Sequence, residues 1–154
     1  MTSRHPDNIT NKDNGKKEKA MENEIKNEAL TLPTDASPKQ TADFIIAVLD
    51  SKKAKDLKLL HVEEQTTLSD YFVLCTGNSR TQVKSLADEV EFRMTQCGVE
   101  PGHVEGGRGD SWILLDYGSV IVHIFGRDAR DFYNIDKLYE GTVEEDISSL
   151  TTED

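Results

Sequence analysis

Two strand-like segments joined by a tight turn constrain the fold of this chain more than any other feature. Residues 111–116 (SWILLD) and 119–125 (SVIVHIF) are rich in β-branched, aromatic and other apolar side chains, and Tyr117-Gly118 lies between them. A two-residue turn that contains glycine, placed between two such segments, predicts a β-hairpin. The fold therefore contains a sheet that is antiparallel at least in part.

A turn at these two residues sets Asp116 opposite Ser119 and Trp112 opposite His123. Because successive side chains of a strand point to opposite faces, the hairpin has one wholly aliphatic face, which we expect to be core. Its members are Ile113, Leu115, Val120, Val122 and Ile124. The other face is mixed in character and consists of Trp112, Leu114, Asp116, Ile121, His123 and Phe125.

The mixed face has two interpretations. Helices could cover both faces of the hairpin, which would make His123 a core histidine beside Trp112. Alternatively the mixed face is partly open, and the only tryptophan of the chain, with Tyr and Arg side chains nearby, forms an interaction hot spot. Both interpretations stay open on the residues alone.

Two segments show the apolar period of amphipathic helices. Residues 38–53 follow Ser37-Pro38, which is typical of a helix cap followed by proline in the first turn. Residues 83–97 carry one apolar face and precede Gly98, a typical C-terminal stop. We therefore expect two helices here, and short helical turns over 127–133 and 134–139.

Further strands are predicted over 57–64 and over 71–76, the second of which is apolar throughout and is expected at the centre of the sheet. The order helix, strand, strand, helix, hairpin, helix predicts a single α/β (α+β) domain, with a mixed sheet and helices packed on it. We expect this domain over residues 37–142, after a disordered extension (1–36) and before an acidic disordered tail (143–154).

Charge and composition limit the function classes. The chain has 18 Lys and Arg against 29 Asp and Glu, a net charge of -11, and its last twelve residues contribute five acids and no base. Such acidity argues against a nucleic-acid binder and favours a basic partner. No apolar run approaches the roughly 18 residues of a membrane helix, and no signal peptide is recognisable, so we expect a cytoplasmic protein without a membrane partner.

Residues with metal or nucleophilic chemistry are few. The histidines and Cys75 and Cys97 lack the short paired spacings of zinc sites, so we expect no metal and no cofactor. Cys75 lies in an apolar strand and is interpreted as an inert core thiol.

The segment Gly77-Asn78-Ser79 ends a strand and opens a helix. It is either a simple capped turn or, alternatively, the phosphate-contacting turn of a nucleotidyltransferase-like, Mg²⁺-dependent enzyme. The enzyme would need paired carboxylates, for which Asp110 or Asp116 are candidates, yet no Asp-x-Asp occurs there. We therefore expect no catalytic residues.

Several motifs together resemble the ribosomal silencing factor S family, also called Iojap-like proteins, over residues of about 40–142. The motifs are Ser69-Asp70-Tyr71-Phe72-Val73, Thr76-Gly77-Asn78-Ser79, Gln82-Val83, Glu105-Gly106, Trp112-Ile113-Leu114-Leu115-Asp116-Tyr117-Gly118, Val122-His123-Ile124-Phe125 and Arg130-Asp131-Phe132-Tyr133. Ser119 and Tyr139 depart from the family pattern, which commonly has Asp and Trp there.

The resemblance implies an α/β domain of nucleotidyltransferase-like shape without established catalysis. Family members bind the large ribosomal subunit through its fourteenth large-subunit protein, block joining with the small subunit and repress translation, and organelle relatives assist large-subunit biogenesis. The partner is a basic protein, so no direct sequence-specific contact with nucleic acid is expected. The resemblance also raises the expectation that the mixed face is open. It implies a docking surface drawn from Trp112, Asp116, Tyr117, Gly118, His123, Arg130, Phe132 and Tyr133.

Overall fold

Six strands form one mixed sheet in a computed structural model that describes residues 31–106 and 111–152. The elements in chain order are α2 (Pro38–Ser51), β1 (Lys55–His61), β2 (Tyr71–Gly77), α3 (Arg80–Gln96), β3 (His103–Glu105), β4 (Trp112–Asp116), β5 (Val120–Gly126), α4 (Arg127–Tyr133), α5 (Ile135–Leu138) and β6 (Val143–Glu144). The strand order is β3-β4-β5-β2-β1-β6. The central strands β2 and β5 are parallel and the other pairs are antiparallel, which confirms the mixed α/β fold and the central place of β2.

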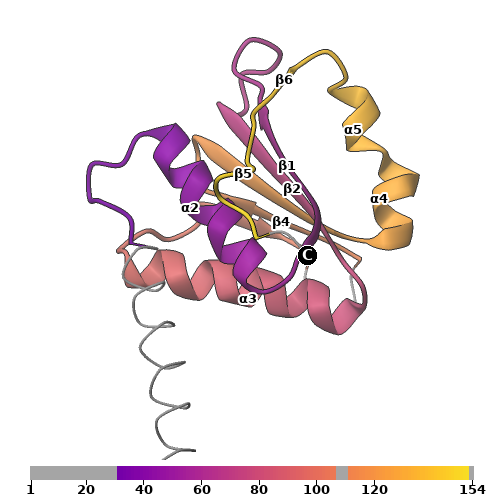
Figure 1. The fold of residues 1–154 in the computed structure, drawn as a ribbon, viewed down its shortest axis with the longest axis horizontal. Helices are drawn as coiled ribbons and strands as arrows, with labels where there is room; N and C mark the ends of the chain where they lie inside the picture. Colours follow the sequence, from indigo (N-terminus) through magenta and orange to yellow (C-terminus); the bar gives the residue numbers. More distant parts are fainter. Residues whose placement is uncertain (1–30, 107–110, 153–154) are drawn as a thin grey trace, which may run out of the picture. The chain divides into compact units, whose positions relative to one another are not determined.

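Helices cover the two faces of the sheet separately, with α2 and α3 on one face and α4 and α5 on the other (Figure 1). The predicted cap of α2 is confirmed, because the Ser37 hydroxyl accepts the Gln40 N–H while the Gln40 side chain accepts the Ser37 N–H. Helix α3 is followed by Gly98, whose φ of +83° is the left-handed conformation expected after a helix end. Both long helices bury one apolar face against the aliphatic side of the sheet.

The hairpin forms, but its register differs by two residues from the predicted one. Trp112 lies opposite Phe125 and Asp116 opposite Ile121, so four residues (117–120) lie between the last paired residues instead of two. Asp116 favours this longer loop because its Oδ1 accepts the N–H of Gly118 at 2.8 Å, with Gly118 in the left-handed region at φ +83°. A shift of two residues keeps every side chain on its predicted face.

The acidic tail is ordered as far as residue 152, which corrects the prediction of a disordered segment from residue 143. Strand β6 pairs with the edge strand β1, and the Glu145 N–H donates to the Leu59 carbonyl at 2.8 Å. Further along, the Thr152 N–H donates to Asp50 Oδ2 at 2.9 Å. The unpaired backbone groups at the edge of β1 supply the partners that the composition of the tail did not reveal.

The predicted N-terminal extension falls mostly on residues 1–30, which lie outside the described residues. Residues 31–36 lead into α2 through a turn, in which the Ala36 N–H donates to the Pro33 carbonyl at 3.2 Å. Strand β3 was not predicted, and it pairs with β4 at the far edge of the sheet. The helices within the described ranges lack the length and apolar character needed to cross a membrane.

Candidate docking surface

The mixed face of the hairpin is covered along β5 and half-open along β4. Ile121, His123 and Phe125 are buried, and Ile121 and Phe125 belong to an apolar cluster that includes Ala129 of α4 and packs against Ile135 of α5. Trp112 and Leu114 on β4 pack against this cluster but are only partly buried. The mixed face is therefore closed along β5 and partly open along β4, and the interaction hot spot stays a prediction.

A hydrogen bond joins the two residues that gave this face its unusual character. The Trp112 Nε1–H donates to His123 Nδ1 at 3.3 Å, and His123 is only 4% exposed. Burial lowers the pKa of His123 to about 4, and the positive charge of Arg130 acts in the same direction. His123 is therefore neutral at pH 7 and carries its proton on Nε2, which is buried without a hydrogen-bond partner among the described residues.

Aromatic rings connect this buried pair to the surface of α4. The Trp112 ring lies 5.1 Å from that of Phe125 and 4.6 Å from that of Tyr133, measured between ring centroids. Tyr133 in turn meets Phe132 edge-on at 5.1 Å. Such contacts stabilise aromatic pairs beyond the area they bury, so the outer rings have a fixed support.

The two short helices carry large apolar side chains that are open to solvent. Phe132 is 80% exposed on α4, and Leu138 is 72% exposed on α5. We define the docking surface as Trp112, Phe132, Tyr133 and Leu138. Large apolar side chains displayed together on short helices are typical of a contact site for another macromolecule.

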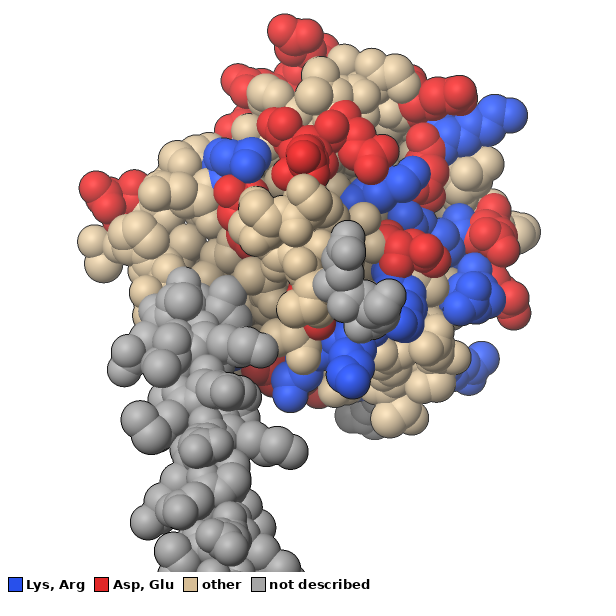
Figure 2. Space-filling model, in the orientation of Figure 1, with Lys and Arg blue, Asp and Glu red and all other residues tan. Residues whose placement is uncertain are grey.

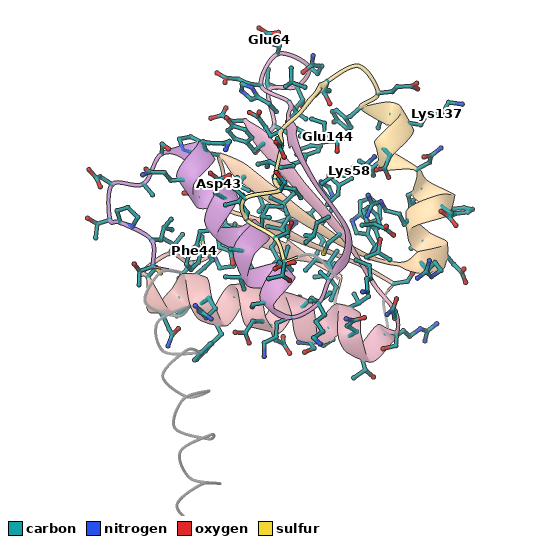
Figure 3. All side chains as sticks on the ribbon, in the orientation of Figure 1. Asp43, Phe44, Lys58, Glu64, Lys137 and Glu144 are labelled. Atoms are coloured by element: carbon teal, nitrogen blue, oxygen red, sulfur yellow. The ribbon has the colours of Figure 1, made fainter. Side chains whose placement is uncertain are left out.

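Arg130 was predicted to belong to this surface, but its guanidinium is used within the chain. It donates to both carboxylate oxygens of Asp136, at 2.8 and 2.9 Å, to the Asp56 carbonyl at 3.0 Å and to Thr76 Oγ1 at 2.9 Å. Lys58, labelled in Figure 3, adds an ion pair to Asp136 at 2.9 Å. The hydrogen bond from Arg130 holds the pKa of Asp136 well below its usual range, with Lys58 contributing.

This network fastens the short helices to the sheet. Arg130 lies on α4, Asp136 on α5, and their partners belong to β1 and β2. Helices as short as these have little stability of their own, so their position depends on such contacts and on the apolar cluster beneath them. Arg130 therefore holds α4 and α5 in place, and its contact with a partner stays a prediction.

Asp116, Tyr117 and Gly118 lie at the opposite end of β4 from Trp112. The Tyr117 hydroxyl is buried without a hydrogen-bond partner among the described residues, and burial raises its pKa, with Glu91 and Glu100 adding to the effect. Glu91 belongs to α3, so Tyr117 lies toward that helix. The structure brings together Trp112, His123, Phe132 and Tyr133, and it separates these three hairpin residues from them.

Leu138 is the member of the surface that the sequence did not single out. The only signal was an apolar residue in a short polar segment, which is weak because single exposed leucines are common. Tyr139, noted as a departure from the family pattern, packs inward, with its ring centroid 4.9 Å from that of Phe72.

The turn Gly77-Asn78-Ser79 has the geometry of a capped strand-to-helix turn. The Ser79 hydroxyl accepts the Gln82 N–H at 3.0 Å, and Gly77 is required because a Cβ there would lie 2.9 Å from Val83 Cγ2. Asp116 lies at the far end of β4, about 13 Å along the strand from Trp112, the β4 residue nearest this turn. It cannot share a metal ion with the turn, and Asp110 lies outside the described residues.

The described residues offer little other chemistry. They contain no group of three or more His, Cys, Asp or Glu side chains arranged to hold a metal ion. Cys75 is buried in β2, and burial raises its pKa to about 12, so its thiol is protonated and unreactive at neutral pH.

These features define a class: an α/β domain with a mixed sheet that carries exposed aromatic and aliphatic side chains on two short helices. A family model described as ribosomal silencing factor during starvation matches residues 34–154. The chain belongs to this family, as the sequence motifs predicted. The match includes residues 143–154, which the sequence prediction had placed outside the family domain.

Individual relatives agree with this membership. The chain is 38% identical over 93 residues to the ribosomal silencing factor of Bacillus subtilis, which covers 60% of this chain and 79% of the relative. It is 25% identical over 100 residues to the mouse protein named mitochondrial assembly of ribosomal large subunit protein 1, covering 63% and 44% of the two chains. A crystal structure of a Chromobacterium violaceum protein superposes with a TM-score of 0.66 at 32% identity, covering 68% and 88%.

Proposed function

We propose that this protein binds the large ribosomal subunit in the cytoplasm and blocks its association with the small subunit, which represses translation. The contact is made by the docking surface on a basic ribosomal protein, the fourteenth of the large subunit. The observation that carries the proposal is the supported chain of rings from Trp112 through Tyr133 to the exposed Phe132. Membership of the silencing-factor family supplies the ribosomal context.

Charge around the docking surface supports a basic partner. Two exposed carboxylates lie beside its apolar residues, Asp131 on α4 and Glu140 just after α5. An apolar centre with an acidic rim suits a basic protein surface, because the rim accelerates and orients the encounter while the buried rings provide most of the affinity.

The proposed mechanism is steric and needs no catalysis. A domain bound on the face of one subunit that meets the other prevents joining by occupying the space, provided that its affinity is sufficient. Trp112, Phe132, Tyr133 and Leu138 supply that affinity, and His123 supports the Trp112 ring from beneath. A contact through the hairpin loop at Asp116, Tyr117 and Gly118 stays a prediction from the family resemblance.

The test is co-sedimentation of the full chain with purified subunits, followed by light scattering during subunit joining. The wild type is expected to travel with large subunits, to be absent from joined ribosomes and to slow joining. Phe132→Ala is expected to weaken binding by about 30-fold, the effect of losing a hot-spot side chain. Phe92→Ala, which truncates an exposed phenylalanine on α3, is the matched control and is expected to bind normally.

Two results would contradict the proposal. One is sedimentation of the wild type with neither subunit; the other is equal weakening by both phenylalanine substitutions, which would show that the docking surface has no special role.

A second role in assembly of the large subunit is favoured by the name of the mouse relative. The same docking surface would then bind precursors of the large subunit before they mature. Depletion of the protein is expected to cause such precursors to accumulate, and Phe132→Ala is expected to restore assembly less well than Phe92→Ala.

A further inference from the structure

Exposed Lys and Arg side chains gather at the end of the sheet where the parallel strands β2 and β5 finish. Residues 39–142 contain twelve Lys and Arg, although their carboxylates outnumber them. Six of the twelve are exposed at this one end and are here called the basic end: Lys52, Lys53, Lys55, Arg80, Lys84 and Arg127. Figure 2 shows blue side chains over the lower right of the view, where α2 ends and α3 begins, and carboxylates over the top.

Contacts within the chain show that the basic end is one surface. The register of β2 and β5 places Gly77 beside Gly126, so the residues that follow both strands begin side by side. Across this edge Arg127 Nη2 donates to Asn78 Oδ1 at 3.2 Å. On the other side of the turn, Gln82 Nε2 donates to the Lys53 carbonyl at 3.5 Å, which joins the α2–β1 loop to the start of α3.

Nearby carboxylates neutralise only part of this positive charge. Asp88 pairs with Lys84, and Glu89 lies 3.8 Å from Lys52. Asp50 accepts hydrogen bonds from Thr152. Two further carboxylates at this end, on Asp56 and Asp128, are exposed.

Three cations are left without a carboxylate partner within residues 31–106 and 111–152. The side chains of Lys53 and Arg80 pair with no acid there, and Arg127 donates to the Asn78 amide, which is neutral. Two of the three are arginines, whose planar guanidinium matches the oxygens of a phosphate better than an ammonium does. The available donors at the basic end therefore suit phosphodiester groups.

We propose that the basic end contacts the phosphate backbone of ribosomal RNA while the docking surface is bound to protein. This inference rests on the proposed function, which places the chain on a particle made of RNA and basic proteins. It adds a contact that does not depend on RNA sequence, since phosphates carry no base information. The acidic net charge of the whole chain argued against nucleic-acid binding. The local concentration of cations at the basic end nevertheless allows a contact with RNA there.

Helix α4 gives the two surfaces a fixed relation. Arg127 is its first residue, and Phe132 and Tyr133 are its last two, so about 8 to 9 Å of helix separates Arg127 from these two rings. A ribosomal protein bound at one end of α4 leaves neighbouring RNA within reach of the other end. The acidic remainder of the molecule repels RNA, so the basic end also orients the chain as it approaches.

The test compares charge-neutralising variants in binding to intact large subunits over a series of salt concentrations. The variants are Lys53→Gln, Arg80→Gln and Arg127→Gln, singly and combined. Lys39→Gln is the matched control, because it removes one positive charge from α2, outside the basic end. Binding of each variant to the isolated basic ribosomal protein is measured in parallel.

Loss of three phosphate contacts is expected to make the decrease of log affinity with log salt less steep by about two to three. Each single variant is expected to make it less steep by about 0.7 to 0.9. Affinity for large subunits at low salt is expected to fall on the order of tenfold in the combined variant. Lys39→Gln is expected to match the wild type, and binding to the isolated ribosomal protein is expected to stay unchanged in every variant.

The possible failures are distinguishable. If the wild type binds neither large subunits nor the ribosomal protein, the proposed function fails and the RNA contact fails with it. If the wild type binds large subunits and the combined variant keeps the same salt slope, only the RNA contact is overturned. If the combined variant loses as much affinity for the isolated ribosomal protein as for large subunits, the basic end contacts an acidic patch of that protein. This result would likewise overturn the RNA contact.

Discussion

Trp112 donates its indole N–H to Nδ1 of His123 across 3.3 Å, so a partly buried ring of the docking surface is tied to a buried imidazole. The bond requires Nδ1 to be unprotonated, because a protonated imidazole has donors at both nitrogens. Protonation of His123 therefore breaks the bond and leaves a charge in an apolar cluster. The position of Trp112 depends on the protonation state of a residue that is closed off from solvent.

The first prediction concerns the pH dependence of stability. The pKa of His123 is lowered from 6.5 to about 4 in the folded chain, so the unfolded chain binds more protons between these values. The free energy of unfolding is therefore expected to be highest above pH 6.5 and to fall by about 3 kcal/mol as the pH decreases to 4. Urea unfolding followed at intervals of pH over this range measures the loss.

Substitution of the imidazole isolates this contribution. His123→Asn keeps an acceptor near the Trp112 N–H without a titrating group, so its free energy of unfolding is expected to vary less over the same pH range. His61→Asn is the control, since His61 is partly exposed beside Tyr71, and it is expected to retain the dependence. The carboxyl of Asp136, whose pKa is lowered, loses its contribution only below its unfolded value of 3.8, outside this range. An unchanged slope in His123→Asn would contradict the assignment.

The second prediction separates a positioning residue from a surface residue on the same helix. Arg130→Met removes the bidentate partner of Asp136 and the donors to Asp56 and Thr76, so the free energy of unfolding is expected to fall by roughly 3 kcal/mol. Arg127→Met removes an exposed guanidinium and is expected to change it by less than about 0.5 kcal/mol. Chemical denaturation of both variants provides the comparison. Similar losses in the two would rule out a special role for the Arg130 network.

A third prediction concerns Leu138, which the sequence did not mark. Leu138→Ala is expected to weaken binding to large subunits by about tenfold, with little change in the unfolding midpoint, because the side chain is exposed in the free chain. Leu68→Ala, at a leucine that is 67% exposed in the β1–β2 loop, serves as the control and is expected to bind like the wild type. Weakening by both substitutions to the same degree would extend the contact well beyond the docking surface defined above.

Most of the fold could be predicted because long helices and strands show the apolar period of their secondary structure. The two long helices, β2 and both hairpin strands are visible as apolar patterns, and the faces of the hairpin were assigned correctly. The register of the hairpin could not be predicted, because it depends on the bond from Gly118 to the Asp116 carboxylate, which lengthens the loop. Strands of two or three residues, such as β6 and β3, are too short to show a period.

The candidate site was predictable in part, for a different reason. Trp112 stood out on the mixed face as the only tryptophan of the chain, whereas Phe132 and Tyr133 were predicted from the family resemblance. The role of Arg130 could not be found from its neighbours in sequence, since the Asp56 and Thr76 groups that it contacts are 74 and 54 residues away. Aromatic residues can be recognised from their type, whereas the role of a charged residue depends on the partner it meets in the folded chain.

The last prediction tests the ordered tail, which the composition had suggested to be disordered. The Glu145 N–H donates to the Leu59 carbonyl on the edge strand β1, and proline at this position removes that donor. Glu145→Pro is therefore expected to lower the free energy of unfolding by about 1 kcal/mol relative to Glu145→Ala. The two variants lose the same carboxylate, so the difference between their free energies of unfolding does not include the effect of charge. Urea unfolding of both variants measures this difference. If the proline variant is as stable as the alanine variant, the pairing of the tail with β1 does not contribute to stability. In that case the amide hydrogen of Glu145 in the wild type should exchange as fast as in an unpaired segment.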